Sequence, residues 1–188
     1  MGKKVLIVAG DAVEALEIFY PYYRCLEEGL ACTIASPTKK QLQTVVHDFL
    51  PGIETYTEKP GYLLESHAAI AEIDPSQFDA LIIPGGRAPE YIRMNQSMVE
   101  AAAHFLKEEK PIGVICHGSL VLTPVRNYMH GRELTAYPAC KAEVEAAGAV
   151  YSENQVHVEG NIVSGQAWPD LPSFMKEFFS LLRGKVTV

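Results

Sequence analysis

The sequence predicts a doubly wound α/β fold, with a mostly parallel sheet and helices on both faces. Short runs of aliphatic residues without polar alternation are typical of strands that are buried on both sides. Along the chain these runs alternate with amphipathic helical segments, which is the order expected for parallel strands joined by crossover helices. The 188 residues fit one domain. We therefore expect residues 1–188 to form a single unit, since no internal repeat or linker is found.

The first unit of this pattern is complete within 36 residues. Val5–Ala9 is wholly apolar and predicts a buried strand. Residues 13–26 have apolar side chains at helical spacing, and Gly29 ends the predicted helix. Pro21 lies inside that helix and should kink it, because proline has no amide hydrogen to donate. Cys32–Ala35 then predicts the second strand.

The same alternation returns in the second half of the chain. Further strands are predicted at Ala80–Ile83 and Pro111–Ile115, and at the two arms of a small hairpin, Val156–Val158 and Asn161–Val163. Helices are predicted at Met98–Lys107, from Ser119 onward, at Ala139–Ala147 and at Pro172–Leu182.

Residues 40–75 interrupt this alternation. Within them, Thr44–His47 and Ile53–Tyr56 predict two short extra strands, and Glu58–Gly61 predicts a turn because it contains Pro-Gly. We therefore expect one domain with an elaborated middle.

Composition excludes several classes of protein. Asp and Glu number 23 against 16 Lys and Arg, a net charge of −7, which argues against binding nucleic acid or anionic membranes. The apolar run near the N-terminus is too short for a signal peptide or a membrane span, so we expect a cytoplasmic protein. The four cysteines lack C-x-x-C spacing, and neither a histidine ligand pattern nor a nucleotide-binding motif is present. No metal or cofactor is therefore predicted.

Cys116 is the strongest candidate for chemistry. Ligands of such folds bind at the carboxyl ends of the strands, and Cys116-His117-Gly118 directly follows the strand Pro111–Ile115. A sharp strand-to-helix turn resembles the nucleophile elbow of hydrolases, and the positive end of the following helix would lower the pKa of the Cys116 thiol. Gly118 would let a ligand approach the backbone. The alternative is an ordinary buried thiol.

Two further features lie at neighbouring strand ends. Gly85 and Gly86 follow the strand Ala80–Ile83, and their amides could line an oxyanion-binding concavity or form a plain tight turn. Glu14 begins the first helix, where burial would raise its pKa so that it shares a proton with the thiol. The alternative is a solvated glutamate that complements the helix dipole. Cys25 and Cys32 are interpreted as core residues, and Cys140 is left undecided.

Three separated motifs resemble the DJ-1/PfpI superfamily nearly end to end. They are Glu14 with Tyr20–Arg24, Ile83–Glu90 and Ile115–Gly118. The resemblance implies a flavodoxin-like fold of the class I glutamine amidotransferase type. It also makes Cys116 the nucleophile, Glu14 its carboxyl partner, and the amides of Gly86 and His117 the oxyanion hole.

Other segments are similar to one branch of that family. Residues 55–61, 135–139 and 167–169 resemble bacterial proteins and plant DJ-1 homologues with glyoxalase III activity, and the archaeal intracellular proteases somewhat less. This implies a cofactor-free enzyme for small reactive carbonyls, a glutathione-independent glyoxalase or deglycase in stress protection. Two departures are present: Ser119 replaces Pro or Gln of relatives, and Leu171 replaces a histidine that could aid proton transfer.

Two other functions stay open. The first is a PfpI-type peptidase or amidase for short peptides, in which Glu90 of a neighbouring subunit orients His117 beside Cys116; this reading requires a homo-oligomer. The second is a redox sensor or stress-protective binding protein in which Cys116 is oxidised to a sulfinic acid.

Overall fold

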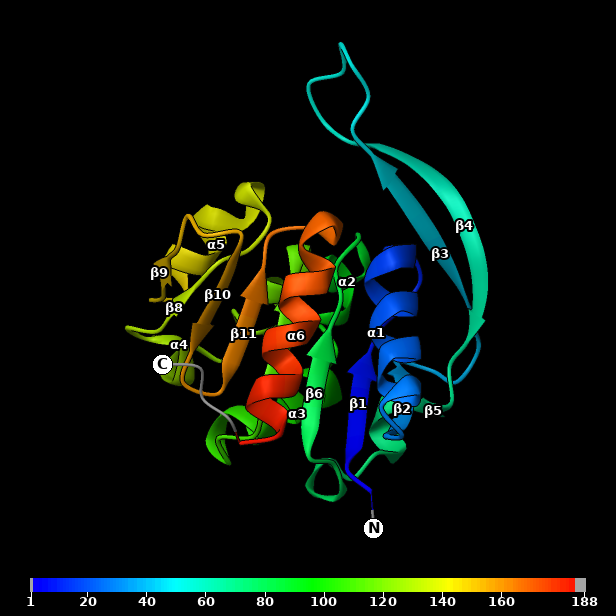
Figure 1. Ribbon diagram of the computed structural model, residues 1–188, viewed down its shortest axis with the longest axis vertical. Coiled ribbons are helices and arrows are strands. Elements are labelled where there is room, and N and C mark those ends of the chain that lie inside the picture. Colours follow the sequence, from blue (N-terminus) through cyan, green and yellow to red (C-terminus); the bar gives the residue numbers. More distant parts are fainter. Residues whose placement is uncertain (1, 185–188) are drawn as a thin grey trace.

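The computed structural model describes residues 2–184. Its centre is a seven-stranded sheet of order β10-β11-β7-β6-β1-β2-β5 (Figure 1). All neighbouring strands are parallel except the hairpin of β10 with β11. The strands are β1 (Lys4–Val8), β2 (Ala31–Ser36), β5 (Ala68–Ala69), β6 (Ala80–Ile83), β7 (Ile112–Ile115), β10 (Val156–Glu159) and β11 (Ile162–Gly165). The predicted doubly wound fold is confirmed.

Helices cover both faces of this sheet (Figure 1). They are α1 (Ala15–Glu27), α2 (Ala88–Ile92), α3 (Gln96–Lys107), α4 (Arg126–Met129), α5 (Lys141–Ala146) and α6 (Leu171–Leu182). Side chains of β1 alternate between the faces: Val5 and Ile7 pack in the cluster with α1 and α6, while Leu6 and Val8 pack in the cluster with α3. The wholly apolar strand pattern follows from this two-sided burial.

A two-stranded arm, β3 (Gln41–Asp48) and β4 (Thr57–Glu65), projects from the domain (Figure 1). The predicted strand at Ile53–Tyr56 is wrong, because these residues lie in the loop at the tip of the arm, and the predicted turn at Glu58–Gly61 is wrong, because it lies inside β4. Pro60 is tolerated there because β4 pairs with β3 alone, so one edge of β4 needs no amide donor.

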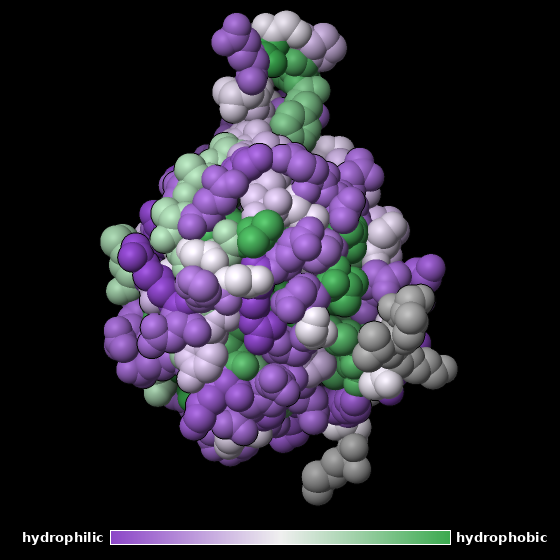
Figure 2. Space-filling model, turned by 90° about the vertical axis from the view of Figure 1, so that its left-hand side faces the viewer, coloured by the Kyte–Doolittle hydropathy of each residue, from purple (hydrophilic) through white to green (hydrophobic). Residues whose placement is uncertain are grey.

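The tip of the arm is apolar at its surface. Phe49, Leu50 and Ile53 are 50%, 40% and 52% exposed, and Figure 2 shows the tip as a projection with hydrophobic side chains on it.

Several helical details differ from the sequence expectation. Cys116–Val121 is a 3₁₀ helix, not the start of an α-helix, and α4 begins only at Arg126. Helix α1 continues through Pro21 as one helix. A 3₁₀ turn at 138–140 precedes α5, and the parallel pair β8 (Glu133–Leu134) and β9 (Val150–Tyr151) was not predicted. No helix among residues 2–184 is long and apolar enough to cross a membrane.

Candidate active site

Cys116 occupies a strained backbone position at the carboxyl end of β7. Its φ is 58°, in the left-handed region that non-glycine residues rarely adopt. Such a conformation costs roughly 1–3 kcal/mol and persists only where surrounding contacts enforce it. The residue is 6% exposed. The backbone thus turns sharply after the strand and keeps the thiol in an enclosed position above the sheet.

Glycines make room for this turn. A β-carbon on Gly85 would lie 2.6 Å from both Cβ of Cys116 and Oε2 of Glu17. At Gly118 it would lie 2.2 Å from the carbonyl oxygen of Ile83. Gly118 therefore lets the 3₁₀ helix pack against β6, and its role in ligand approach stays a prediction.

Two backbone amides point at the sulfur. The N–H groups of Gly86 and His117 donate hydrogen bonds to Cys116 and favour its ionised form. Gly86 has a φ of 74°, which turns its amide toward the thiol. These are the two amides that the family resemblance implies for an oxyanion hole, and the geometry brings them together around one atom.

The carboxyl group in contact with the thiol is that of Glu17. It is hydrogen-bonded to Cys116, and its Oε2 accepts from the Gly85 amide at 2.8 Å. Glu14 was the expected partner, but it is the N-cap of α1, and its Oε2 accepts from the Glu17 amide at 2.9 Å. The expectation for Glu14 is therefore corrected: its carboxylate caps the helix, and the next turn presents Glu17 to the sulfur.

Both glutamates are buried, and both have perturbed acidity. Glu17 is 0% exposed, and burial together with the charge of Glu14 raises its pKa to about 8. Burial also raises the pKa of Glu14, as expected. Glu17 can therefore hold a proton near neutral pH, which is the property needed for proton exchange with a reacting group.

The pKa of the Cys116 thiol is raised, not lowered. Burial is the first cause and the charge of Glu17 the second, and together they outweigh the hydrogen bonds from the Gly86 and His117 amides. The expected lowering by a helix end is wrong, because the turn after Cys116 is a short 3₁₀ helix while the nearest charge is a carboxylate. Cys116 and Glu17 thus compete for protons as a coupled pair.

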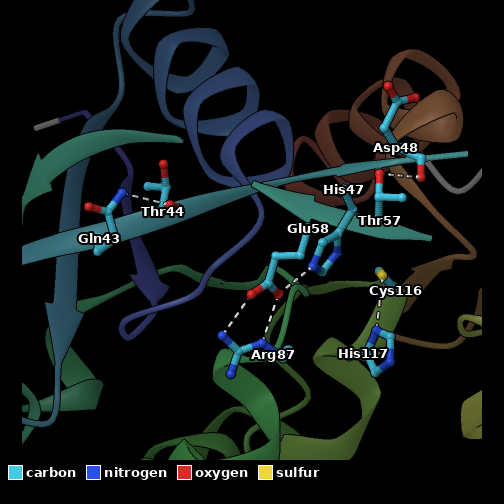
Figure 3. Close-up of polar contacts among 9 residues, drawn as sticks. All are labelled: Gln43, Thr44, His47, Asp48, Thr57, Glu58, Arg87, Cys116 and His117. Atoms are coloured by element: carbon cyan, nitrogen blue, oxygen red, sulfur yellow. Dashed lines mark hydrogen bonds and ion pairs between the residues drawn. The ribbon is translucent and has the colours of Figure 1, made fainter. Parts of the chain in front are cut away.

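His117 lies beside the thiol, with Nδ1 3.3 Å from Sγ of Cys116 (Figure 3). Its ring stacks on Tyr137 at 4.9 Å between centroids, and Tyr56 contacts it edge-on at 6.1 Å. Burial and the nearby His47 lower its pKa to about 4. The imidazole is therefore neutral at pH 7.

A charged cluster joins the arm to the body next to these residues. The Glu58 carboxylate lies between the Arg87 guanidinium, at 2.7 and 2.8 Å, and Nε2 of His47, at 2.9 Å (Figure 3). The hydrogen bond from Arg87 is the main cause that lowers the pKa of Glu58 to about 2. His47 in turn stacks on Tyr56 at 4.2 Å.

The cavity at the thiol is small and mostly aromatic. It holds about 10 Å³, roughly the space of one water molecule. Its lining comes from α1, the arm, the Cys116 turn and the segment before α6: Glu14, Glu17, His47, Phe49, Tyr56, Cys116, Tyr137, Ala167 and Trp168. A carbonyl compound can therefore reach the thiol only when the lining side chains move apart, which favours small molecules or one reactive end of a larger one.

The remaining predicted residues lie outside this contact network. Glu90 is exposed on α2, and no hydrogen bond or ion pair found within residues 2–184 joins it to His117. A role for Glu90 through a neighbouring copy stays a prediction. Leu171, the first residue of α6, is 4% exposed in the core, and Ser119 is buried. Within the described residues, no three Cys, His, Asp or Glu side chains gather as a metal site requires.

Comparison with known proteins identifies the family of this chain. The model of the DJ-1/PfpI family matches residues 3–181. The chain belongs to the DJ-1/PfpI family. The resemblance that the motifs around Glu14, Gly86 and Cys116 indicated is therefore confirmed.

The relatives include proteins of archaea and plants. A deglycase of Pyrococcus abyssi is 38% identical over 96% of this chain and 99% of its own length, and Deglycase PfpI of Pyrococcus furiosus is 36% identical with the same coverage. Protein DJ-1 homolog D of Arabidopsis thaliana is 36% identical over 96% of this chain, which spans 48% of that relative.

Solved structures agree in fold. A ThiJ/PfpI domain protein from Brachyspira murdochii superposes with a TM-score of 0.82 at 18% identity, covering 97% of this chain and 96% of its own. Oxidised DJ-1 from Toxoplasma gondii superposes with a TM-score of 0.79 at 19% identity, covering 98% and 92%.

Proposed function

We propose that this DJ-1/PfpI protein is a cysteine-dependent enzyme for small reactive carbonyls, a deglycase or glutathione-independent glyoxalase. One observation carries the proposal: the Cys116 thiol contacts a carboxyl group, Glu17, whose pKa is raised to about 8. A nucleophile and a proton carrier are thus paired where two amides can hold an oxyanion. The deglycase names of archaeal relatives that match almost end to end support the same class of substrate.

The first step is addition of the thiol to an aldehyde. In the form of the pair that has one proton, that proton lies on Cys116, whose pKa is the higher, and Glu17 is a carboxylate that accepts it as the sulfur attacks. The sulfur forms a bond to the carbonyl carbon, the C=O π bond breaks, and the new alkoxide takes the proton of Glu17. The amides of Gly86 and His117 stabilise the developing negative charge. The product is a hemithioacetal and Glu17 is left as a carboxylate.

With a 2-oxoaldehyde such as methylglyoxal, the second step is an isomerisation. The Glu17 carboxylate removes the proton from the carbon bonded to sulfur, and the neighbouring carbonyl becomes an enol. Return of a proton to the second carbon converts the enediol to a thioester of a 2-hydroxy acid. Water then cleaves the thioester, so that methylglyoxal and water yield lactate and the thiol is regenerated.

The same first step serves a deglycase. An early adduct of the aldehyde with an amine or thiol is a hemiaminal or hemithioacetal. When its C–N or C–S bond breaks, the C=O bond forms again and the amine or thiol leaves with the hydroxyl proton. The freed aldehyde then adds to Cys116 as described above. The small aromatic cavity favours such a short reactive group over a bulky one.

The test measures lactate formed from methylglyoxal without glutathione, using wild type, Cys116→Ala, Glu17→Gln and Glu14→Gln. We expect no turnover with Cys116→Ala and a loss of about 100-fold or more with Glu17→Gln, typical of a missing general acid–base group. Glu14→Gln should retain most of the activity, because its amide oxygen can still cap the helix. Cys140→Ala is the control for a buried thiol outside the cavity. Equal activity of wild type and Cys116→Ala would overturn the proposal.

A second candidate is a peptidase or amidase. The contact between His117 and Cys116 favours it, since a thiol and an imidazole within 3.3 Å form the core of a cysteine hydrolase. It needs Glu90 of a neighbouring copy to orient the imidazole, and the arm must open to admit a peptide. Cleavage of short peptides by the assembled oligomer, lost in both Cys116→Ser and Glu90→Gln, would support it. Activity that is unchanged in Glu90→Gln would speak against the shared site.

A further inference from the structure

A second pair of thiols lies away from the Cys116 cavity. Cys25 is in the last turns of α1 and Cys32 is the second residue of β2, against which α1 packs (Figure 1). The connection between them is tight: the Leu30 amide donates to the Cys25 carbonyl at 2.9 Å, and Gly29 adopts a φ of 71°. The two side chains are hydrogen-bonded to each other.

The two thiols differ in access. Cys25 is 0% exposed, whereas Cys32 is half-buried at the edge of the same apolar cluster. A reagent from solvent can therefore reach the Cys32 sulfur first. The Cys25 sulfur is buried behind Cys32 and is hydrogen-bonded to it. This is the arrangement of an attacking cysteine with a resolving cysteine.

We propose that Cys25 and Cys32 are a redox-active pair that closes to an intramolecular disulfide when a low-molecular-weight disulfide, such as glutathione disulfide, is the oxidant. The Cys32 thiolate attacks one sulfur of the oxidant, the S–S bond breaks, and one thiolate leaves. The Cys25 thiolate then attacks the Cys32 sulfur of the mixed disulfide and displaces the second thiolate. Two protons leave the protein, which is oxidised by two electrons, while the small disulfide is reduced by two.

The environment sets the pH dependence of this exchange. The hydrogen bond to Cys25, followed by burial, raises the pKa of Cys32. The groups near the pair are Tyr22, which interacts with Cys32, and His67, whose ring lies 5.8 Å from that of Tyr22. Because the thiolate is the attacking species, the exchange should be slow at neutral pH and should accelerate as the pH rises. The bond would fasten the C-terminal end of α1 to the sheet.

The sequence makes the test direct, because trypsin cuts after Arg24 and Lys39 and releases both cysteines in one peptide. The reduced, full-length protein is incubated with glutathione disulfide at several pH values, alkylated in denaturant, and digested without reductant. We expect the peptide of residues 25–39 to be free of alkyl groups and about 2 Da lighter than the dithiol, the mass of two hydrogens. Its yield should rise with pH.

Variants separate the two steps. Cys25→Ala should stop at the mixed disulfide, with glutathione on Cys32, and Cys32→Ser should leave Cys25 unmodified. The Cys116→Ala protein should form the disulfide as wild type does, so this result does not depend on the proposed catalytic function. A wild-type peptide that keeps glutathione on Cys32, or in which both thiols are alkylated at pH 9 after long incubation, would refute the proposal.

Discussion

Replacing Glu17 by glutamine should stabilise the protein while it removes activity. A carboxyl whose pKa rises from 4.5 to about 8 destabilises the fold by about 5 kcal/mol once it is fully ionised, because each pKa unit corresponds to about 1.4 kcal/mol. The conversion is justified here because Glu17 is fully buried. Glutamine has nearly the same shape, can still accept from the Gly85 amide, and has no proton to lose.

The sign of the effect follows from the raised pKa. The folded state binds the Glu17 proton more tightly than the unfolded state, so the penalty is absent below pH 4.5 and grows until the pH passes about 8. At pH 7 we expect Glu17→Gln to be more stable than wild type by about 3 kcal/mol, less the contribution of any carboxyl contact that the glutamine does not replace.

Urea unfolding at pH 5, 7 and 9 measures this directly. The stability difference between Glu17→Gln and wild type should be small at pH 5 and should increase at each step. Glu14→Gln is the comparison variant: the pKa of Glu14 is also raised by burial and its charge acts on Glu17, so its stability difference should increase with pH as well, but by less than that of Glu17→Gln. If the stability difference between Glu17→Gln and wild type does not change between pH 5 and 9, Glu17 is ionised at its ordinary pKa. Glu17 could then not carry the proton in the proposed reaction.

Three shorter predictions follow from the same region. Gly118→Ala should lower stability by about 3 kcal/mol, because its β-carbon would lie 2.2 Å from a carbonyl oxygen of β6; a melting temperature equal to that of wild type would contradict the close packing. In Arg87→Ala the pKa of Glu58 should rise from about 2 toward its ordinary value, as followed by carboxyl NMR titration; a pKa that stays at about 2 would assign the effect to other groups. Alkylation of Cys116 by iodoacetamide at pH 8 should be faster in Glu17→Gln, since the repulsion by the Glu17 charge is gone; a slower rate would show that the carboxyl assists thiolate formation.

Features that depend on local pattern could be predicted from the sequence. The central strands β1, β6 and β7 are apolar on both faces, and a glycine or Cys116 follows each within two residues, so the strand that leads to Cys116 could be found from hydropathy alone. The amides of Gly86 and His117 meet at the sulfur as the family resemblance implied. The arm was harder to predict, because Pro60 and Gly61 are typical of a turn, whereas an unpaired strand edge accommodates both.

Hydropathy does not show which of two glutamates contacts the Cys116 thiol. Glu14 and Glu17 are three residues apart, so both lie on the same side of the first helical turn. Which of them contacts Cys116 depends on where the helix starts. Glu14 has extended backbone angles and is the N-cap, so Glu17 is the third helical residue. The available signal was the Glu-x-x-Glu spacing: if Glu14 is read as the N-cap, Glu17 becomes the third helical residue.

The same start of α1 explains why the acidity of Cys116 was predicted with the wrong sign. A helix end near a thiol stabilises the thiolate, but a buried carboxylate at hydrogen-bond distance opposes it more strongly. Because Glu14 caps α1, the charge of Glu14 also acts on Glu17 and raises its pKa further. Glu17 therefore retains at neutral pH a proton that an isolated carboxyl would lose, and Cys116 remains a thiol. A proton shared by Cys116 and Glu17 can pass to the alkoxide oxygen that forms when the sulfur adds to a carbonyl group. An ionised thiolate beside an ionised carboxylate would have no such proton to give.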